Sequence, residues 1–169
     1  MASEPQLRNK ILFFITCFLI ICLYLFSRYS IAFTGSKTTG CLPVDVALID
    51  NWNTSIKRGQ LIYFRSENAE PLFANNTKFL KIAAALEGDQ VTINKDSVIV
   101  TNRSYSREYA VDATRMLNYL NWPLSMIEKT FTVEVGQVFA LGTLPSSFDS
   151  RYWGTVSTKN IEGVAYAIY

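Results

Sequence analysis

The hydrophobic residues of this sequence are concentrated in one run near the amino terminus. Residues 11–26 read ILFFITCFLIICLYLF without a charge, and extension to Phe33 admits only one, Arg28. A helix over residues 11–33 would be about 35 Å long at about 1.5 Å per residue, enough to cross a hydrocarbon core of about 30 Å. The pattern predicts a cytoplasmic segment at 1–10, a transmembrane anchor at 11–33 and an exported domain at 34–169.

Two other interpretations of the apolar run compete with a retained anchor. A buried core helix would carry a polar stripe, and the run has none. A cleaved signal peptide fits the positive charges of Arg8 and Lys10, and Ser30-Ile31-Ala32 resembles a cleavage site with small residues. A retained anchor is favoured because the run slightly exceeds the usual length of a signal peptide's apolar region, about 7–15 residues. Under either exported interpretation, the amino end stays cytoplasmic.

The exported part predicts a mainly β fold. Short β-rich runs occur at Val46–Ile49, Gln60–Arg65, Val91–Ile93, Val98–Thr101, Thr130–Val135 and Gln137–Leu141. Asn94-Lys95-Asp96 is typical of a hairpin turn, and a polar turn around 51–59 separates the first two runs. Arg115–Leu120 and Trp122–Ile127 are interpreted as short helices or an irregular excursion. Without βαβ alternation, these runs predict a coiled β-barrel-like domain after the transmembrane helix.

Composition excludes several kinds of chemistry. The chain has no histidine, which removes Ser-His-Asp and Cys-His catalysis and imidazole zinc sites. Three cysteines provide neither a disulfide framework nor a four-thiolate zinc site, so no metal or cofactor is expected. A formal charge of +2 does not predict nucleic-acid binding, which needs a clustered basic face. Acid–base chemistry must therefore use Lys, Tyr, Asp, Glu or a terminal amine.

Two candidate residues for chemistry are a cysteine and a lysine. Cys41, within Thr39–Pro43, is the only cysteine outside the predicted anchor. An unpaired exported thiol indicates a reactive group, although an inert buried cysteine is the simpler interpretation. Lys81 is the only charge in the apolar run 79–86. Burial disfavours the ammonium form and suits a general base, whereas the simpler interpretation is an edge lysine whose amine reaches solvent.

A third candidate segment is 146–154, which reads SSFDSRYWG. Asp149 and Arg151 are spaced for a charge-assisted pair on one strand face or across a turn. The simpler interpretation is a surface turn that carries an ordinary ion pair.

Together these segments resemble the type I signal peptidase family of membrane-anchored Ser/Lys peptidases. Lys57–Phe64 is similar to the family's "xRGDxVxF" strand, and Leu80–Val91 to its "KRxxGxPGDxV" segment. Ser147–Gly154 is similar to "NSxDSRxWG", the most specific of the three. The resemblance covers essentially the whole chain, anchor included. It implies a signal-peptidase-like β domain and peptidase activity without a metal.

Within that family, Leu42-Pro43, the compact length and the Ser-Phe-Asp-Ser-Arg run look most like the conjugative-transfer (TraF-type) branch. The sequence departs from the family pattern at four positions. Cys41 stands where the family has its nucleophilic serine. Glu87 replaces a proline, Ala85 a glycine, and Asp45 a glycine usual in that branch.

The resemblance implies a role for each candidate residue. Cys41 would be the nucleophile and Lys81 the general base. The oxyanion hole would be formed by the Cys41 backbone N–H and the Thr39 hydroxyl. Ser147 would orient the Lys81 amine, and Asp149 with Arg151 would support that loop.

The implied function is a membrane-anchored endopeptidase with a Cys/Lys dyad that processes exported proteins, above all a pilin or another conjugative transfer component. Its location would be the bacterial inner membrane, single-pass, with a periplasmic catalytic domain. Its partners would be a protein substrate, the membrane and a conjugative secretion apparatus, and no nucleic acid. A housekeeping signal peptidase, a pilin-cyclising transpeptidase and a non-catalytic pilus-assembly factor remain as alternatives.

Overall fold

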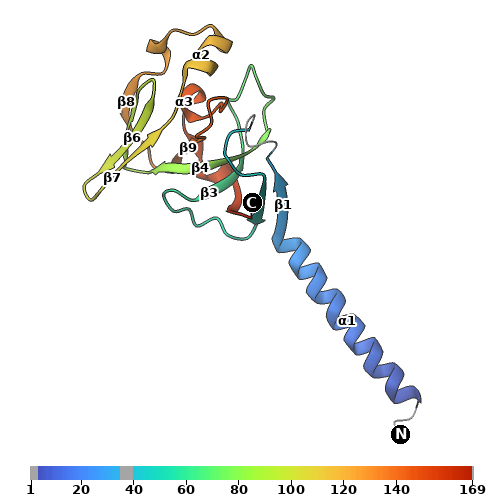
Figure 1. The fold of residues 1–169 in the computed structure, drawn as a ribbon. Coiled ribbons are helices and arrows are strands. Elements are labelled where there is room, and N and C mark those ends of the chain that lie inside the picture. Colours follow the sequence, from blue (N-terminus) through green and yellow to red (C-terminus); the bar gives the residue numbers. More distant parts are fainter. Residues whose placement is uncertain (1–3, 35–39, 169) are drawn as a thin grey trace.

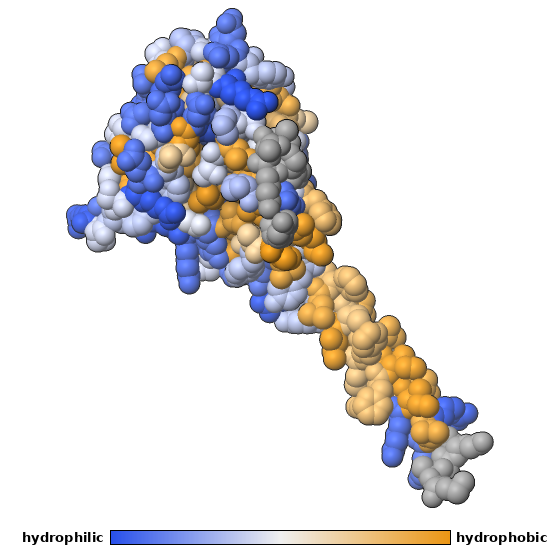
Figure 2. All heavy atoms as spheres, viewed as in Figure 1, coloured by the Kyte–Doolittle hydropathy of each residue, from blue (hydrophilic) through white to orange (hydrophobic). Residues whose placement is uncertain are grey.

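A single long helix projects from a β-rich body in the computed structural model, which describes residues 4–34 and 40–168 (Figure 1). The helix is α1 (Glu4–Arg28), and its apolar part, Gln6–Arg28, is not buried against the rest of the chain. Figure 2 shows this apolar surface continuing to the base of the β-rich body. Within the described ranges α1 is the one helix long and apolar enough to cross a membrane.

The helix ends five residues before the predicted limit of the anchor. Tyr29–Phe33 forms strand β1, which pairs antiparallel with β2 (Val46–Asp50). At this boundary Arg28 donates to both carboxylate oxygens of Asp50, at 3.1 and 2.8 Å. The prediction of one helix over 11–33 is therefore wrong at its carboxyl end, because the backbone groups of its last residues pair with β2 instead.

Most of the β-rich body is a seven-stranded sheet in the order β1-β2-β11-β3-β4-β9-β10. All neighbouring strands are antiparallel. The remaining strands of this sheet are β3 (Leu61–Arg65), β4 (Lys78–Leu86), β9 (Gln137–Leu141), β10 (Val156–Ser157) and β11 (Ile161–Ala167).

A four-stranded sheet, in the order β7-β6-β5-β8, lies between β4 and β9 in sequence. Its strands are β5 (Gln90–Ile93), β6 (Ser97–Asn102), β7 (Tyr105–Ala110) and β8 (Lys129–Thr132). Two short α-helices, α2 (Thr114–Leu120) and α3 (Ser150–Trp153), and 3-10 turns at Leu124–Met126 and Thr158–Asn160 complete the described elements.

The mainly β prediction is confirmed, with differences at particular elements. The hairpin turn at Asn94-Lys95-Asp96 joins β5 to β6, and the Asn94 N–H donates to the Ser97 carbonyl at 2.9 Å. The excursion at 115–127 consists of α2 and a 3-10 turn. The run Thr130–Val135 is a strand only as far as Thr132, and it pairs in a different sheet from β9.

Strand β4 lies between two apolar clusters, which explains its nearly continuous hydrophobic sequence. Phe79 and Ala83 pack into a cluster with Phe64 and Phe148, whereas Leu80 packs on the other side with Leu42. The sheet is curled, because residues of β1 and β4, the first and fifth strands in its order, line the same pocket. This curl forms the half-barrel that carries the candidate site.

We predict that the mature protein retains residues 1–33. Cleavage after Ala32 would remove most of β1 and the Arg28 partner of the buried Asp50 carboxylate, leaving that carboxylate without its ion pair. Carbonate extraction of membranes tests whether the protein stays in the membrane, and amino-terminal sequencing identifies the first residue of the mature product. A soluble product that begins at Phe33 would contradict the prediction.

Candidate active site

The centre of the candidate site is the Lys81 amine. Lys81 lies within β4, opposite Ile62 of β3, and its side chain is fully buried. Its Nζ donates to Ser147 Oγ at 2.8 Å. Among the described residues Lys81 makes no salt bridge with a carboxylate. A buried lysine whose one hydrogen-bond partner among the described residues is a hydroxyl is costly for folding.

Ser147, Asp149 and Arg151 form a buried hydrogen-bonded chain that begins at this amine. The Ser147 hydroxyl donates to Asp149 Oδ2 at 2.8 Å. Arg151 donates to the two oxygens of the same carboxylate, from Nε at 2.8 Å and from Nη2 at 2.9 Å. The pair of Asp149 and Arg151 expected from the sequence is thus present, and it is buried rather than on the surface.

The Asp149 carboxylate is ionised but already balanced by Arg151. Burial alone would raise its pKa, yet the Arg151 guanidinium, the Lys81 charge and the Gly142 N–H together lower it below the usual value. Asp149 also caps the amino end of α3, where its carboxylate accepts from the Arg151 N–H at 3.2 Å. The aspartate therefore fixes the Ser147 hydroxyl in place, and Ser147 in turn holds the lysine.

Cys41 lies on a loop beside this chain and lines a pocket of about 410 Å³. Its carbonyl accepts from the N–H groups of Thr143 and Leu144, at 3.0 and 3.3 Å. Ser146 adds a hydrogen bond from its hydroxyl to the Gly40 carbonyl at 2.9 Å. The segment after β9 therefore contacts the backbone at Cys41 on one side and carries Ser147 on the other.

The structure brings Cys41 near the lysine chain without a direct hydrogen bond between the two groups. Phe79 lines the pocket together with Cys41, and its ring centroid lies 5.5 Å from Lys81 Nζ. In the part of the chain that the structure describes, Cys41 Sγ makes no hydrogen bond with Lys81 Nζ, and the Cys41 N–H donates to no protein acceptor. Thr39, expected at the oxyanion hole, lies outside the described residues.

Gly142 is a position in the candidate site that the sequence analysis missed. A β-carbon at this position would overlap the Ser147 side chain and lie 2.6 Å from the Cys41 carbonyl oxygen. Only glycine lets β9 lead into a turn that contacts both groups at once. A glycine directly after the apolar run 137–141 was the available signal, but the approach of Cys41 comes from a distant part of the chain.

We predict that Gly142→Ala lowers processing activity together with stability. The added methyl group must displace Ser147 or the Cys41 carbonyl, and such overpacking typically costs about 1–3 kcal/mol of unfolding free energy. Thermal unfolding in detergent and a processing assay measure the two effects. Native-like values for both would show that the loop moves aside without consequence.

A second missed pair connects the two sheets. Arg58 and Asp89 stand in the two motif segments quoted above, and the guanidinium donates to both oxygens of the carboxylate, at 2.5 and 2.7 Å. The Asp89 carboxylate is fully buried and also accepts from the Leu86 N–H and the Asn102 amide. Burial alone would raise its pKa, but these donors lower it below the usual value. The pair therefore helps fix β4 against the four-stranded sheet.

We predict that acid weakens the fold partly through Asp89. A carboxylate with a lowered pKa contributes stability that is present above the unfolded-state pKa of about 3.9 and is lost as pH falls through the folded-state pKa. Asp89→Asn should destabilise the protein at neutral pH by about 2 kcal/mol and flatten the fall of stability below about pH 4. Unfolding measured from pH 2 to 7 tests this, and an unchanged acid slope would contradict it.

The described residues contain no cluster of three Cys, Asp or Glu side chains that could hold a metal ion.

Comparison with known proteins identifies the class of protein and then its family. A family model described as signal peptidase, peptidase S26, matches residues 6–169, which makes the chain a hydrolase of the protease class. The chain belongs to the peptidase S26 family of signal peptidases. A crystal structure of a signal peptidase I from Enterococcus faecalis V583 is 24% identical, with 65% of this chain and 96% of that chain covered and a TM-score of 0.43. A search of curated proteins found no match.

Proposed function

We propose that this chain is a membrane-anchored endopeptidase in which Cys41 is the nucleophile and Lys81 the general base. The observation that carries the proposal is the fully buried Lys81 amine, which is hydrogen-bonded to Ser147 and forms no salt bridge with a carboxylate of the described residues. Membership of the signal peptidase family supports the reaction class. A cysteine thiol is a stronger nucleophile than a serine hydroxyl, so a cysteine in this position suits acyl transfer.

In the proposed reaction Lys81 acts as the base that takes the proton of the Cys41 thiol as sulfur attacks the scissile carbonyl carbon. The resulting oxyanion accepts a hydrogen bond from the Cys41 N–H, which has no other protein acceptor in the described residues. The tetrahedral intermediate collapses when Lys81 returns the proton to the leaving amine, and a thioester remains on Cys41. Lys81 then takes a proton from the water molecule that attacks the thioester carbon, and it returns this proton to the Cys41 sulfur as the carbon–sulfur bond breaks and the cleaved segment leaves with a new carboxyl group.

A strand edge beside Lys81 is available for an extended substrate. The pairing of β4 with β9 begins at Ile82, so among the described strands residues 78–81 pair with β3 alone. Strand β1, which lines the other side of the same pocket, is an edge strand of the sheet. An extended peptide can add between these two edges by backbone hydrogen bonds, which is a common mode of peptide recognition.

The proposal extends to location and substrate. The apolar α1 would hold the chain in the bacterial inner membrane, with the β-rich body on the periplasmic side. The substrate would be an exported protein, and the sequence similarity of Leu42-Pro43 and Ser147–Arg151 to the conjugative-transfer branch points to a pilin or another conjugation component.

Mass spectrometry of a candidate pilin, from cells with and without this protein, tests the proposal. We expect a mature amino terminus only when the native chain is present. A linear product supports hydrolysis, and a product lacking one water indicates that the substrate's own amine has taken the acyl group. Identical pilin masses in both strains, together with general loss of processing of other exported proteins, would favour a housekeeping role.

A further inference from the structure

Lys78 lines the same pocket as Cys41, and it belongs to a cluster of three charged residues, here called the Lys78 cluster and made up of Arg65, Lys78 and Glu162. Arg65 of β3 and Lys78 of β4 are directly opposite in the strand pair. Both contact Glu162 of β11, with Lys78 Nζ 3.1 Å from Oε2 and Arg65 Nε against Oε1. Their side chains are 44%, 42% and 29% exposed, so the cluster remains accessible to a ligand.

The Lys78 cluster carries a net positive charge at neutral pH. Burial raises the pKa of Glu162, but its hydrogen bonds with Lys78 and Arg65 lower it below the usual value, so the carboxylate is ionised. One carboxylate is therefore shared between two permanent cations. The remaining positive charge is available to an anionic side chain.

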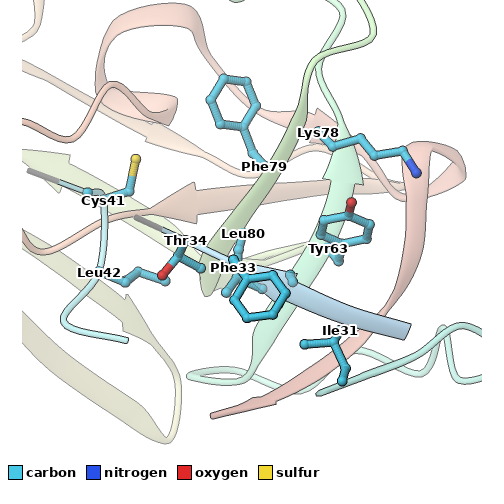
Figure 3. Close-up of a pocket in the computed structure, with 11 residues that line it drawn as sticks. Ile31, Phe33, Thr34, Cys41, Leu42, Tyr63, Lys78, Phe79 and Leu80 are labelled. Carbon is cyan, nitrogen blue, oxygen red and sulfur yellow. The ribbon is translucent and has the colours of Figure 1, made fainter. Parts of the chain in front are cut away.

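Lys78 and the proposed nucleophile Cys41 line the same pocket. Because side chains alternate along a strand, Lys78 and Leu80 share one face of β4, the face on which Cys41 packs. Cys41 and Lys78 both line the pocket, and Figure 3 shows them on opposite sides of it with Leu80 and Tyr63 between. A substrate strand paired with the free edge of β4 has the same rise per residue as β4. The substrate residue opposite Lys78 is therefore about three positions from the substrate residue opposite Lys81.

The direction of the substrate follows from the other wall of the pocket. That wall is β1, which continues directly from α1. Under the proposed function, the apolar export segment of a substrate precedes the scissile bond and would lie in the bilayer beside α1, so the chain that enters along β1 would be the part before the cleavage site. Lys78 therefore faces a residue on the amino-terminal side of the scissile bond.

We propose that Lys78 is a specificity-determining residue that selects an acidic side chain about three or four residues before the scissile bond and disfavours a basic one. This inference rests on the proposed peptidase function and narrows its substrate class. A partly exposed ion pair is worth a few-fold in affinity, and repulsion of a basic side chain adds to the discrimination.

Peptide cleavage by the purified full-length protein tests the inference. The substrates carry Asp, Asn or Lys at each of positions two to five before the cleaved bond. We expect kcat/KM to be about five- to tenfold higher for Asp than for Lys at the third or fourth position, and the ratio to shrink as salt is added. Lys78→Glu should reverse the ratio and Lys78→Gln should reduce it. Lys159→Gln, an exposed lysine outside the pocket, should leave it unchanged.

Binding of the same peptides to Cys41→Ala separates this inference from the proposed function. A charge preference in binding that Lys78→Glu reverses supports the inference, even if the native protein cleaves no peptide and the peptidase proposal fails. Cleavage with an Asp-to-Lys ratio that Lys78→Glu does not alter overturns the inference and leaves the peptidase proposal intact. If Lys78→Glu changes only sedimentation with phosphatidylglycerol vesicles, the cluster contacts lipid headgroups and the inference is overturned.

Discussion

Lys81→Met should fold normally and lose processing activity by about 10²- to 10⁴-fold, the usual contribution of a positioned general acid–base. Methionine has a similar length and no charge, so it fills the same buried position beside Phe79. Because the native amine has no carboxylate in contact among the described residues, its replacement should leave the unfolding temperature equal or higher. Activity and thermal unfolding are measured on the same preparation.

The arginine variant separates proton transfer from positive charge. Lys81→Arg keeps the charge but stays protonated, so it cannot accept the thiol proton and should be inactive. Lys95→Met, at an exposed position in the β5–β6 turn, serves as the matched control and should be fully active. Processing by Lys81→Arg at a native rate would contradict the proton-transfer role. A strongly destabilised Lys81→Met would instead indicate a structural lysine.

Local sequence patterns predicted the elements whose causes are local. The β5–β6 hairpin follows from the turn residues at 94–96, and the Asp149–Arg151 pair from two charges two residues apart. Strand β4 could not be assigned from its pattern, because a continuous apolar run suits a buried strand and a buried helix equally well. The anchor was likewise predicted as far as Phe33, because no local feature of the apolar run shows that its last residues pair with β2.

The candidate site was predictable in its parts but not in its arrangement. The motif segments supplied Lys81, Ser147 and Asp149, which the structure joins in one hydrogen-bonded chain. The requirement for glycine at 142 depends on Cys41, about a hundred residues earlier in the chain, so no local pattern reveals it. The same holds for the Lys78 cluster, whose members come from three strands.

Alkylation of Cys41 tests whether the lysine activates the thiol. The protein used carries Cys17→Ser and Cys22→Ser, so that Cys41 is the only remaining cysteine. Iodoacetamide at neutral pH should react faster with this protein than with its Lys81→Met derivative, because a base that takes the thiol proton generates the reactive thiolate. Alkylation should also stop processing. Equal rates in the two proteins would mean that Lys81 does not act on this thiol.

Cys41→Ala should abolish processing, with a loss of at least about 10³-fold, because removal of a nucleophile leaves only binding and oxyanion stabilisation. The pocket, the Lys81–Ser147 hydrogen bond and the contacts of the Cys41 carbonyl do not depend on the sulfur, so the fold should be unchanged. Cys41→Ser should keep partial activity if the site accepts the smaller oxygen, since the hydroxyl is a weaker nucleophile that depends more strongly on Lys81. The decisive measurement compares mature pilin in cells that express native and Cys41→Ala proteins at equal levels. If both yield the same processed pilin, Cys41 is not the nucleophile, and a non-catalytic assembly role becomes the better explanation of this fold.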